Sequence, residues 1–320
     1  MMGTGTFAEP TFEALLAARE NVVGLVTQPD RDSGNRRGST RQTGKGMANI
    51  AQAAGVPVAQ PESINTPEGL AQLKTFAPDL LVVAAYGQIL SKDVIATPPM
   101  GAINVHASLL PKYRGASPIA HAILNGETRT GVTIIRITLG LDAGDMLATG
   151  AVDILTTETT GELEARLAPL GAGLCVDVLK RMKVGPVSGE KQDPTQVTKA
   201  PKLKKEHGLI DWTKPAAAIG DHVRAMQPWP TAYTFFHRPG KEPIRVIINR
   251  VDPSSRPTLD AGAPAGSISG DAKSMGVKCG DASLEVLELQ PAGKKRMTAE
   301  EFLRGYPIQA GFRFGPEVLA

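Results

Sequence analysis

Short apolar segments alternate with helix-forming segments through the first 184 residues of the chain. Residues 9–19 favour a helix, with apolar residues at 12, 15 and 16, and the β-branched run Val22–Thr27 that follows favours a strand. Residues 65–76 and 80–85 repeat this order. Strands that alternate with helices typically build a mostly parallel sheet covered on both faces. We therefore predict an α/β fold whose N-terminal domain is a Rossmann-like, doubly wound sheet.

Three further apolar runs extend this predicted sheet. Strands are expected at residues 101–105, 132–137 and 150–155. A long helix is expected from Thr160 to Lys183, with Pro169 inside it as a point where the helix kinks or divides. The predicted catalytic domain therefore covers residues 1–184.

The pattern changes after this helix. Residues 185–205 contain Pro, Gly and several Lys residues and are predicted to be a basic linker. From residue 206 to 320, short alternating segments at 243–251, 266–268, 276–279 and 284–290 are separated by turn residues. This spacing predicts a small β-barrel (OB-like) as the C-terminal domain.

Bulk properties exclude several classes of protein. A chain of 320 residues is long enough for two domains. No apolar stretch approaches the roughly 18 residues that span a bilayer, and the N-terminus lacks a signal-peptide pattern, so we expect a cytoplasmic protein without membrane contact. Cys175 and Cys279 lie far apart in no metal-ligand spacing, which favours two reduced thiols.

An asparagine and a histidine stand two positions apart where the apolar run at 101–105 ends. Alternate residues of a strand share a face, so Asn104 and His106 would point into one cleft while Ile103 and Val105 pack on the other side. A lone histidine at a strand end is more often structural than catalytic. The Gly-flanked Asp142, however, belongs at the same carboxyl edge, where ligands bind in such sheets.

These three residue types suit a proton-coupled transfer. Histidine changes charge between pH 5 and 8, a carboxylate can orient it, and an amide can donate to an oxyanion. The sequence pattern around these three residues indicates no Ser, Cys or Lys nucleophile, so direct transfer of a group fits better than a covalent enzyme intermediate. Asp145 fits a loop hydrogen bond better than chemistry, and His121, His207, His222 and His237 have no metal-ligand spacing. We predict no metal site.

Short motifs in both predicted domains point to a known family. They are Met2–Phe12, Thr27–Arg31, Val83–Gly87, Ile103–Pro111, Tyr113–Ala116, Gly131–Ile134, Leu139–Asp145, Ile210–Trp212, Pro228–Pro230 and Leu289–Lys295. Through these motifs the chain closely resembles the methionyl-tRNA formyltransferase family over nearly its full length. The catalytic segment alone marks only the wider group of folate-dependent formyltransferases, whereas the second-domain motifs specify this family.

The resemblance implies an activity and a set of site residues. It implies transfer of the formyl group of 10-formyltetrahydrofolate to the amino group of initiator methionyl-tRNA, the step that prepares this tRNA for translation initiation. Asn104, His106 and Asp142 would be the catalytic residues. The residues implied to bind the folate cosubstrate are Ser108, Leu109, Leu110, Pro111, Gln88, Ile89 and Leu90.

Basic residues are the candidates for holding the tRNA. Residues 30–46 form a long polar stretch, and the resembling family uses an inserted basic loop at this place to reach the acceptor end of the tRNA. Arginine suits this task because it binds phosphate bidentately and stacks on unpaired bases. A solvated loop is the alternative interpretation. The implied tRNA-binding residues are Arg36, Arg37, Arg41 and Lys45 of this stretch and Lys204 and Lys205 of the linker.

The chain departs from the family pattern at its start. Met1-Met2-Gly3 stands where the family has a short apolar strand before the Met-Gly-Thr segment, so the first strand is expected to be missing. Its loss would expose the edges of neighbouring strands. We expect a monomer.

Three other functions remain open from the sequence. A formyltransferase acting on glycinamide ribonucleotide or a nucleotide sugar would share the first domain but leave the second-domain motifs unexplained. A dinucleotide-dependent dehydrogenase fits the sheet, but Gly3-Thr4-Gly5 lacks the third glycine of the usual fingerprint. A non-catalytic tRNA-binding protein would result if the altered N-terminus abolished activity.

Overall fold

The computed structural model describes residues 1–29, 44–254 and 262–319, which form two compact units. The first unit comprises residues 1–122, 128–155 and 161–202. The second comprises residues 123–127, 156–160 and 203–320, of which 255–261 and 320 lie outside the described residues. Arg36, Arg37 and Arg41 also lie outside the described residues.

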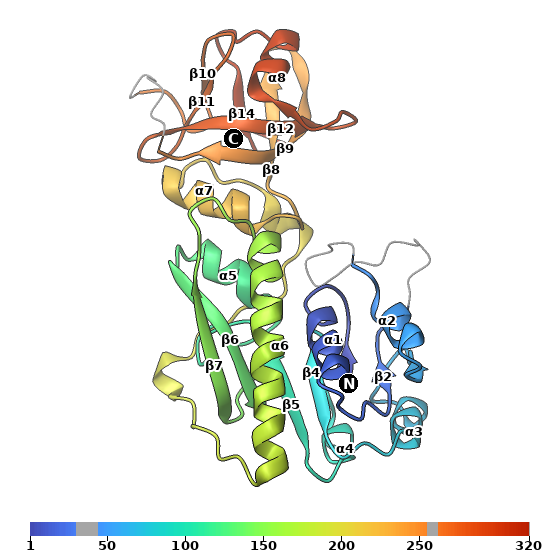
Figure 1. Ribbon diagram of the computed structural model, residues 1–320. Helices are drawn as coiled ribbons and strands as arrows, with labels where there is room; N and C mark the ends of the chain where they lie inside the picture. The colour runs from blue at the N-terminus through green and yellow to red at the C-terminus, as the bar shows by residue number, and fades with distance from the viewer. Residues whose placement is uncertain (30–43, 255–261, 320) are drawn as a thin grey trace. The chain divides into compact units, whose positions relative to one another are not determined.

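The first unit is built on a seven-stranded sheet with the order β3-β2-β1-β4-β5-β6-β7 (Figure 1). The five strands from β3 to β5 run parallel, and β6 and β7 are antiparallel additions at one edge. The predicted mostly parallel sheet is therefore confirmed. The strands are β1 (Met2–Gly3), β2 (Leu25–Val26), β3 (Val58–Ala59), β4 (Leu81–Ala84), β5 (Ala102–His106), β6 (Arg129–Arg136) and β7 (Met146–Asp153).

Helices cover this sheet, and α3 and α4 begin at side-chain caps. The Thr66 hydroxyl accepts a hydrogen bond from the Gly69 amide at the start of α3, and Ser91 caps α4 in the same way. The side chains of Val105 and Val132 face Gly171 of α6, so this helix packs directly on β5 and β6. The helices are α1 (Glu9–Ala17), α2 (Met47–Ala53), α3 (Pro67–Thr75), α4 (Lys92–Ile95), α5 (Pro118–Leu124) and α6 (Thr160–Val184).

Helix α6 runs without a break through Pro169. Of the two outcomes expected at Pro169, a kink or a division of the helix, the division is wrong. Proline removes one backbone donor, and the acceptor left without a partner is the carbonyl four residues earlier, on Ala165. Both Pro169 and Ala165 are exposed, so water can replace the lost hydrogen bond. The buried face of α6, which includes Leu163, Leu167 and Cys175, supplies the packing that keeps the helix continuous.

The first strand is present, which corrects the expectation that it is missing. Met2 is fully buried and pairs with Val26 of β2 and Val83 of β4, so β1 lies inside the sheet between β2 and β4. The strand is only two residues long, and the Met1 carbonyl before it also accepts a hydrogen bond from the Val26 amide. Buried residues pack around it as one core cluster: Met2, Val26, Ile64, Leu73, Leu81, Val83, Tyr86, Leu90, Val94 and Ala102.

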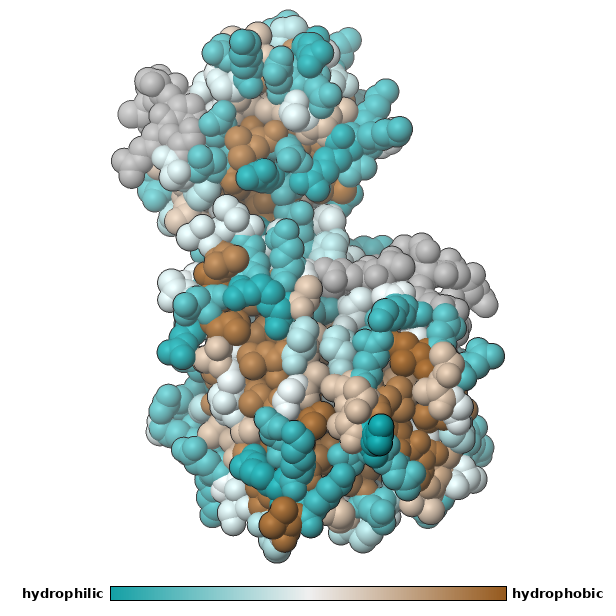
Figure 2. Space-filling view, viewed as in Figure 1, coloured by the Kyte–Doolittle hydropathy of each residue, from teal (hydrophilic) through white to brown (hydrophobic). Residues whose placement is uncertain are grey.

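A cavity of about 410 Å³ lies where β2 and β4 begin. Its lining is largely apolar and includes Leu15, Val23 and Leu73. Figure 2 shows apolar side chains at the surface of the first unit, interspersed with hydrophilic ones. Ligands in open parallel sheets bind at the carboxyl ends of the strands. This cavity lies at the opposite end of the strands, so it is not the catalytic cleft.

The second unit contains a nearly closed antiparallel barrel, as predicted. Its strand order is β10-β11-β12-β9-β8-β14, with β13 paired to β12. Hydrogen bonds between the segments at 266–268 and 312–314 bring the two ends of this order together. The elements are α7 (Ala216–Ala225), β8 (Tyr233–Arg238), β9 (Lys241–Asp252), β10 (Ile268–Gly270), β11 (Met275–Lys278), β12 (Ser283–Pro291), β13 (Met297–Thr298), α8 (Ala299–Gly305) and β14 (Arg313–Gly315).

Candidate active site

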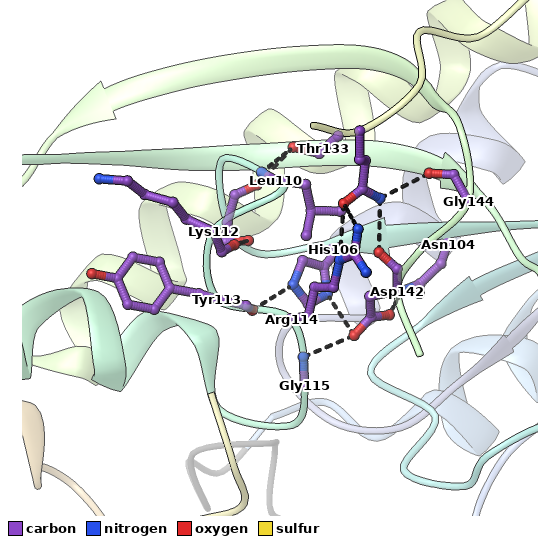
Figure 3. Close-up of polar contacts among 12 residues, drawn as sticks. Asn104, His106, Leu110, Lys112, Tyr113, Arg114, Gly115, Thr133, Asp142 and Gly144 are labelled. Atoms are coloured by element: carbon purple, nitrogen blue, oxygen red, sulfur yellow. Dashed lines mark hydrogen bonds and ion pairs between the residues drawn. The ribbon is translucent and has the colours of Figure 1, made fainter. Parts of the chain in front are cut away.

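Three polar side chains from two neighbouring segments converge at the carboxyl end of β5 (Figure 3). Asn104 lies within β5, His106 is its last residue, and Asp142 lies in the loop between β6 and β7. The His106 Nδ1 atom lies 3.7 Å from Asp142 Oδ2, and Asn104 Nδ2 lies 3.5 Å from Asp142 Oδ1. The structure therefore brings together the three residues that the sequence singled out.

The imidazole of His106 is held by a backbone group. Its Nε2 atom lies 3.0 Å from the carbonyl oxygen of Tyr113, which can only accept a hydrogen bond. Nε2 therefore carries a hydrogen and donates to this carbonyl. Nδ1 is then the nitrogen that faces Asp142. His106 is 5% exposed, so its imidazole is largely shielded from water.

The carboxylate of Asp142 is fixed from two sides. The Gly115 amide donates a 2.9 Å hydrogen bond to Asp142 Oδ2, the oxygen that also faces His106. The backbone of Asp142 has a φ of 47°, in the left-handed region that residues with a Cβ atom rarely adopt. Such a conformation persists at functional sites when the surrounding structure holds it in place. The loop is therefore preorganised around the carboxylate.

The predicted folate residues that follow β5 form a tight, largely buried loop. The Ser108 hydroxyl is fully buried and donates to the Lys112 carbonyl at 2.7 Å. The Leu110 amide donates to the Thr133 hydroxyl of β6, which in turn donates to the Ser108 carbonyl. The Leu110–Pro111 peptide bond is cis. The Ser108 hydroxyl therefore stabilises the conformation of this loop.

The other predicted folate residues follow β4. The Gln88 carboxamide donates to the Glu62 carbonyl and accepts from the Ile64 amide, both at 2.9 Å. Leu90 is buried, whereas the side chain of Ile89 is 77% exposed. Gln88 therefore ties this turn to the segment before α3, and Ile89 offers an apolar surface to a ligand.

The described candidates for tRNA binding are exposed lysines. Lys45 forms a 2.7 Å ion pair with Glu13, which raises the pKa of the lysine through a hydrogen bond and the opposite charge. Lys204 lies 3.7 Å from Glu206, and Lys205 is exposed beside it. All three lysines therefore present charge to solvent, Lys45 and Lys204 each beside a carboxylate.

Sequence reasoning missed the groups that hold the three central side chains. The Tyr113 carbonyl and the Gly115 amide act through the backbone, which gives no signal in a residue pattern. Gln192, which donates to the carbonyls of Asp142 and Gly144, and Arg114, which donates to Gln192, were also missed. The Tyr113 carbonyl and the Gly115 amide could have been found from the sequence only through the resemblance of the Tyr113–Ala116 segment to the family.

Two structural observations bear on other kinds of site. Among the described residues, no group of three or more His, Cys, Asp or Glu side chains is placed to hold a metal ion. Within that same part of the chain, no helix is both long and apolar enough to cross a membrane.

Comparison with known proteins gives matches over both units. A family model described as formyl transferase matches residues 1–179, and one described as formyl transferase, C-terminal domain, matches residues 202–307. The methionyl-tRNA formyltransferase of Trichlorobacter lovleyi is 43% identical over 310 residues, which cover 97% of this chain and 94% of that protein.

Solved structures share the fold at low sequence identity. The N-formyltransferase of Helicobacter canadensis, solved with folinic acid and dTDP-3-aminofucose, matches with a TM-score of 0.63 and 17% identity over 91% of this chain and 97% of that one. The methionyl-tRNA formyltransferase of Clostridium thermocellum matches with a TM-score of 0.54 and 16% identity over 82% and 93% of the two chains.

Proposed function

The chain belongs to the methionyl-tRNA formyltransferase family, and we propose that Asn104, His106 and Asp142 carry out its reaction. The enzyme transfers a formyl group to the amino group of initiator methionyl-tRNA and so prepares this tRNA for translation initiation. The formyl donor is a folate derivative, and we assign it as 10-formyltetrahydrofolate. The observation that carries the assignment of residues is the convergence of the three side chains within 3.7 Å at the carboxyl end of β5.

Each of the three side chains has a distinct task in this proposal. The substrate amine attacks the formyl carbon, forming a new C–N bond and an oxyanion. The Asn104 amide and the protonated His106 Nδ1 donate hydrogen bonds to this oxyanion. The Asp142 carboxylate stabilises the imidazolium and orients a water that carries the proton from the amine to the departing folate nitrogen. The bond between the formyl carbon and that nitrogen then breaks.

Two loops at the same sheet edge are proposed to hold the folate. Leu109, Leu110 and Pro111 would pack against it, with the loop shape maintained by the buried Ser108 hydroxyl. Gln88, Ile89 and Leu90 would line the pterin position, where the exposed Ile89 side chain supplies apolar contact. Burying an apolar side chain of this size against a ligand stabilises the complex by about 1.5–3 kcal/mol.

We expect the exposed lysine pair at 204 and 205 to contribute to tRNA affinity. The double variant Lys204→Ala/Lys205→Ala should raise KM for methionyl-tRNA several-fold and leave KM for the folate donor unchanged. Because each contacted phosphate contributes about −0.9 to the logarithmic salt dependence of duplex binding, the slope should become shallower by about 2. Titrating tRNA binding at several salt concentrations measures this slope.

A surface lysine of the first unit provides the matched control for this pair. Lys180 is 66% exposed on α6 and forms an ion pair with Asp177. Lys180→Ala should leave both KM and the salt slope unchanged. An unchanged slope in the 204/205 double variant would show that these lysines do not contact phosphate.

Formyl transfer to charged initiator tRNA tests the activity directly. The purified protein is given 10-formyltetrahydrofolate and either initiator methionyl-tRNA, glycinamide ribonucleotide or an amino-sugar nucleotide. We expect product with the tRNA and background levels with the other two acceptors. Transfer to one of the small acceptors in preference to the tRNA would contradict the proposed substrate, and tRNA binding without transfer would contradict the proposed chemistry.

A further inference from the structure

One carboxamide outside the catalytic triple makes four hydrogen bonds at the active-site loop. Gln192 Nε2 donates to the carbonyl oxygens of Asp142 and Gly144, both at 2.8 Å. Gln192 Oε1 accepts from Nε and Nη2 of Arg114, at 3.0 and 2.8 Å. Figure 3 includes the Arg114 side chain among the polar contacts of the site. The carboxamide thus uses both of its hydrogens and two acceptor positions.

These bonds join two loops that carry different parts of the site. Arg114 lies between Tyr113, whose carbonyl holds His106, and Gly115, whose amide holds Asp142. Asp142 and Gly144 belong to the loop after β6. Gln192 therefore connects the backbone that positions the imidazole to the backbone that positions the carboxylate.

The segment that carries Gln192 is itself anchored on both sides. Glu190 exchanges two 2.8 Å backbone hydrogen bonds with Met146 at the start of β7. Ala200 donates to the Arg114 carbonyl at 2.7 Å, and Arg114 donates to the Thr198 carbonyl at 2.9 Å. Because the backbone on both sides of Gln192 is held by hydrogen bonds, its side chain can act as a fixed connection between Arg114 and the loop that contains Asp142.

The loop that Gln192 binds, which contains Asp142 and Gly144, has a strained backbone conformation. Asp142 adopts the left-handed backbone region, and a Cβ atom on Gly144 would lie 1.8 Å from the Arg136 carbonyl oxygen. The loop therefore lies tightly against β6, and its strained residue is the one whose carbonyl Gln192 binds. We propose that Gln192 is a positioning residue, which holds Asp142 in the orientation needed for formyl transfer. This inference rests on the proposed role of Asp142 in the reaction.

The bridge requires an amide. Its nitrogen faces two carbonyl oxygens and its oxygen faces a guanidinium, so the isosteric Gln192→Glu would place an oxygen against both carbonyls while keeping the contact with Arg114. Gln192→Ala removes all four hydrogen bonds. We expect either variant to lower kcat by about 10- to 100-fold, the loss that a displacement near 1 Å produces, with both KM values within about twofold of wild type.

A double-mutant cycle with Asp142→Ala distinguishes positioning from a general structural role. Once the Asp142 carboxylate is gone, its orientation no longer matters, so Gln192→Ala should cause no further loss in that background. Single-turnover formylation measures the low rates. Gln196→Ala is the matched control, because this glutamine lies four residues along the same segment and donates to Asp193 instead. It should keep the wild-type kcat.

Each outcome has a defined meaning. Equal losses from Gln192→Ala in the wild-type and Asp142→Ala backgrounds, or an unchanged kcat in both Gln192 variants, would overturn the positioning role while leaving the catalytic triple intact. Wild-type turnover in Asp142→Ala alone would overturn the proposed role of Asp142 and this inference with it. Thermal melting of each variant shows whether it is folded, and the isosteric Gln192→Glu keeps the test open if Gln192→Ala is not.

Discussion

Replacing His106 with alanine is expected to lower kcat by about 10²- to 10⁴-fold, the range that a positioned proton-transfer group contributes. The structure directs the chemistry to one atom of this side chain. Nε2 hydrogen-bonds to the Tyr113 carbonyl, so in the proposed mechanism Nδ1, next to Asp142, is the nitrogen that donates to the oxyanion. Steady-state and single-turnover formylation of methionyl-tRNA measure the loss.

A second substitution separates the chemistry of His106 from its structural contact. Alanine would leave the buried Tyr113 carbonyl without its donor, at a cost of about 1–3 kcal/mol. His106→Gln can place an amide nitrogen near the Nε2 position and restore this hydrogen bond, but it cannot carry the proton. We expect His106→Gln to recover stability in urea unfolding while its kcat stays as low as that of His106→Ala.

A histidine of the second unit is the control for this experiment. His237 Nε2 contacts the Pro316 carbonyl, so His237→Ala also removes a hydrogen bond from histidine to the backbone, here an exposed one. Its kcat should stay within about threefold of wild type. Full activity in His106→Gln would show that the reaction needs the hydrogen bond and not the imidazole.

The sequence was sufficient to predict the sheet and the face that carries the central residues. Strand periodicity placed Asn104 and His106 on one face, and the order of strands placed Asp142 at the same edge. These predictions depend on local patterns and on topology, both of which a single chain reveals.

The supports of the site depend on contacts that no local pattern contains. Gln192 and Asp142 are separated by 50 positions, and the other two supports are a carbonyl and an amide of the main chain. Pro169 shows the converse case. A local rule predicted a kink or a division of the helix, and the division does not occur because the opposite face of the helix is buried. Likewise β1 persists with two residues because both of its neighbours pair with Met2.

Asn104→Asp should lower kcat by about 10²- to 10³-fold, the typical cost of removing one donor to an oxyanion. The substitution keeps the shape of the side chain but replaces its N–H₂ group with an oxygen. That oxygen would lie near Asp142 Oδ1, because the native Asn104 Nδ2 atom is 3.5 Å from Asp142 Oδ1. Two carboxylates at this distance disfavour each other's charged form, so Asp142 would also lose part of its ability to stabilise the imidazolium.

The kinetic pattern identifies which state loses the interaction. The oxyanion forms only during transfer, so kcat should fall while KM for the folate and for the tRNA changes little. Asn49→Asp adds the same charge on α2, where the native amide donates to the Lys45 carbonyl, and should leave turnover unchanged. If Asn104→Asp instead raised KM with kcat intact, Asn104 would bind the ground state, and the oxyanion would depend on His106 alone.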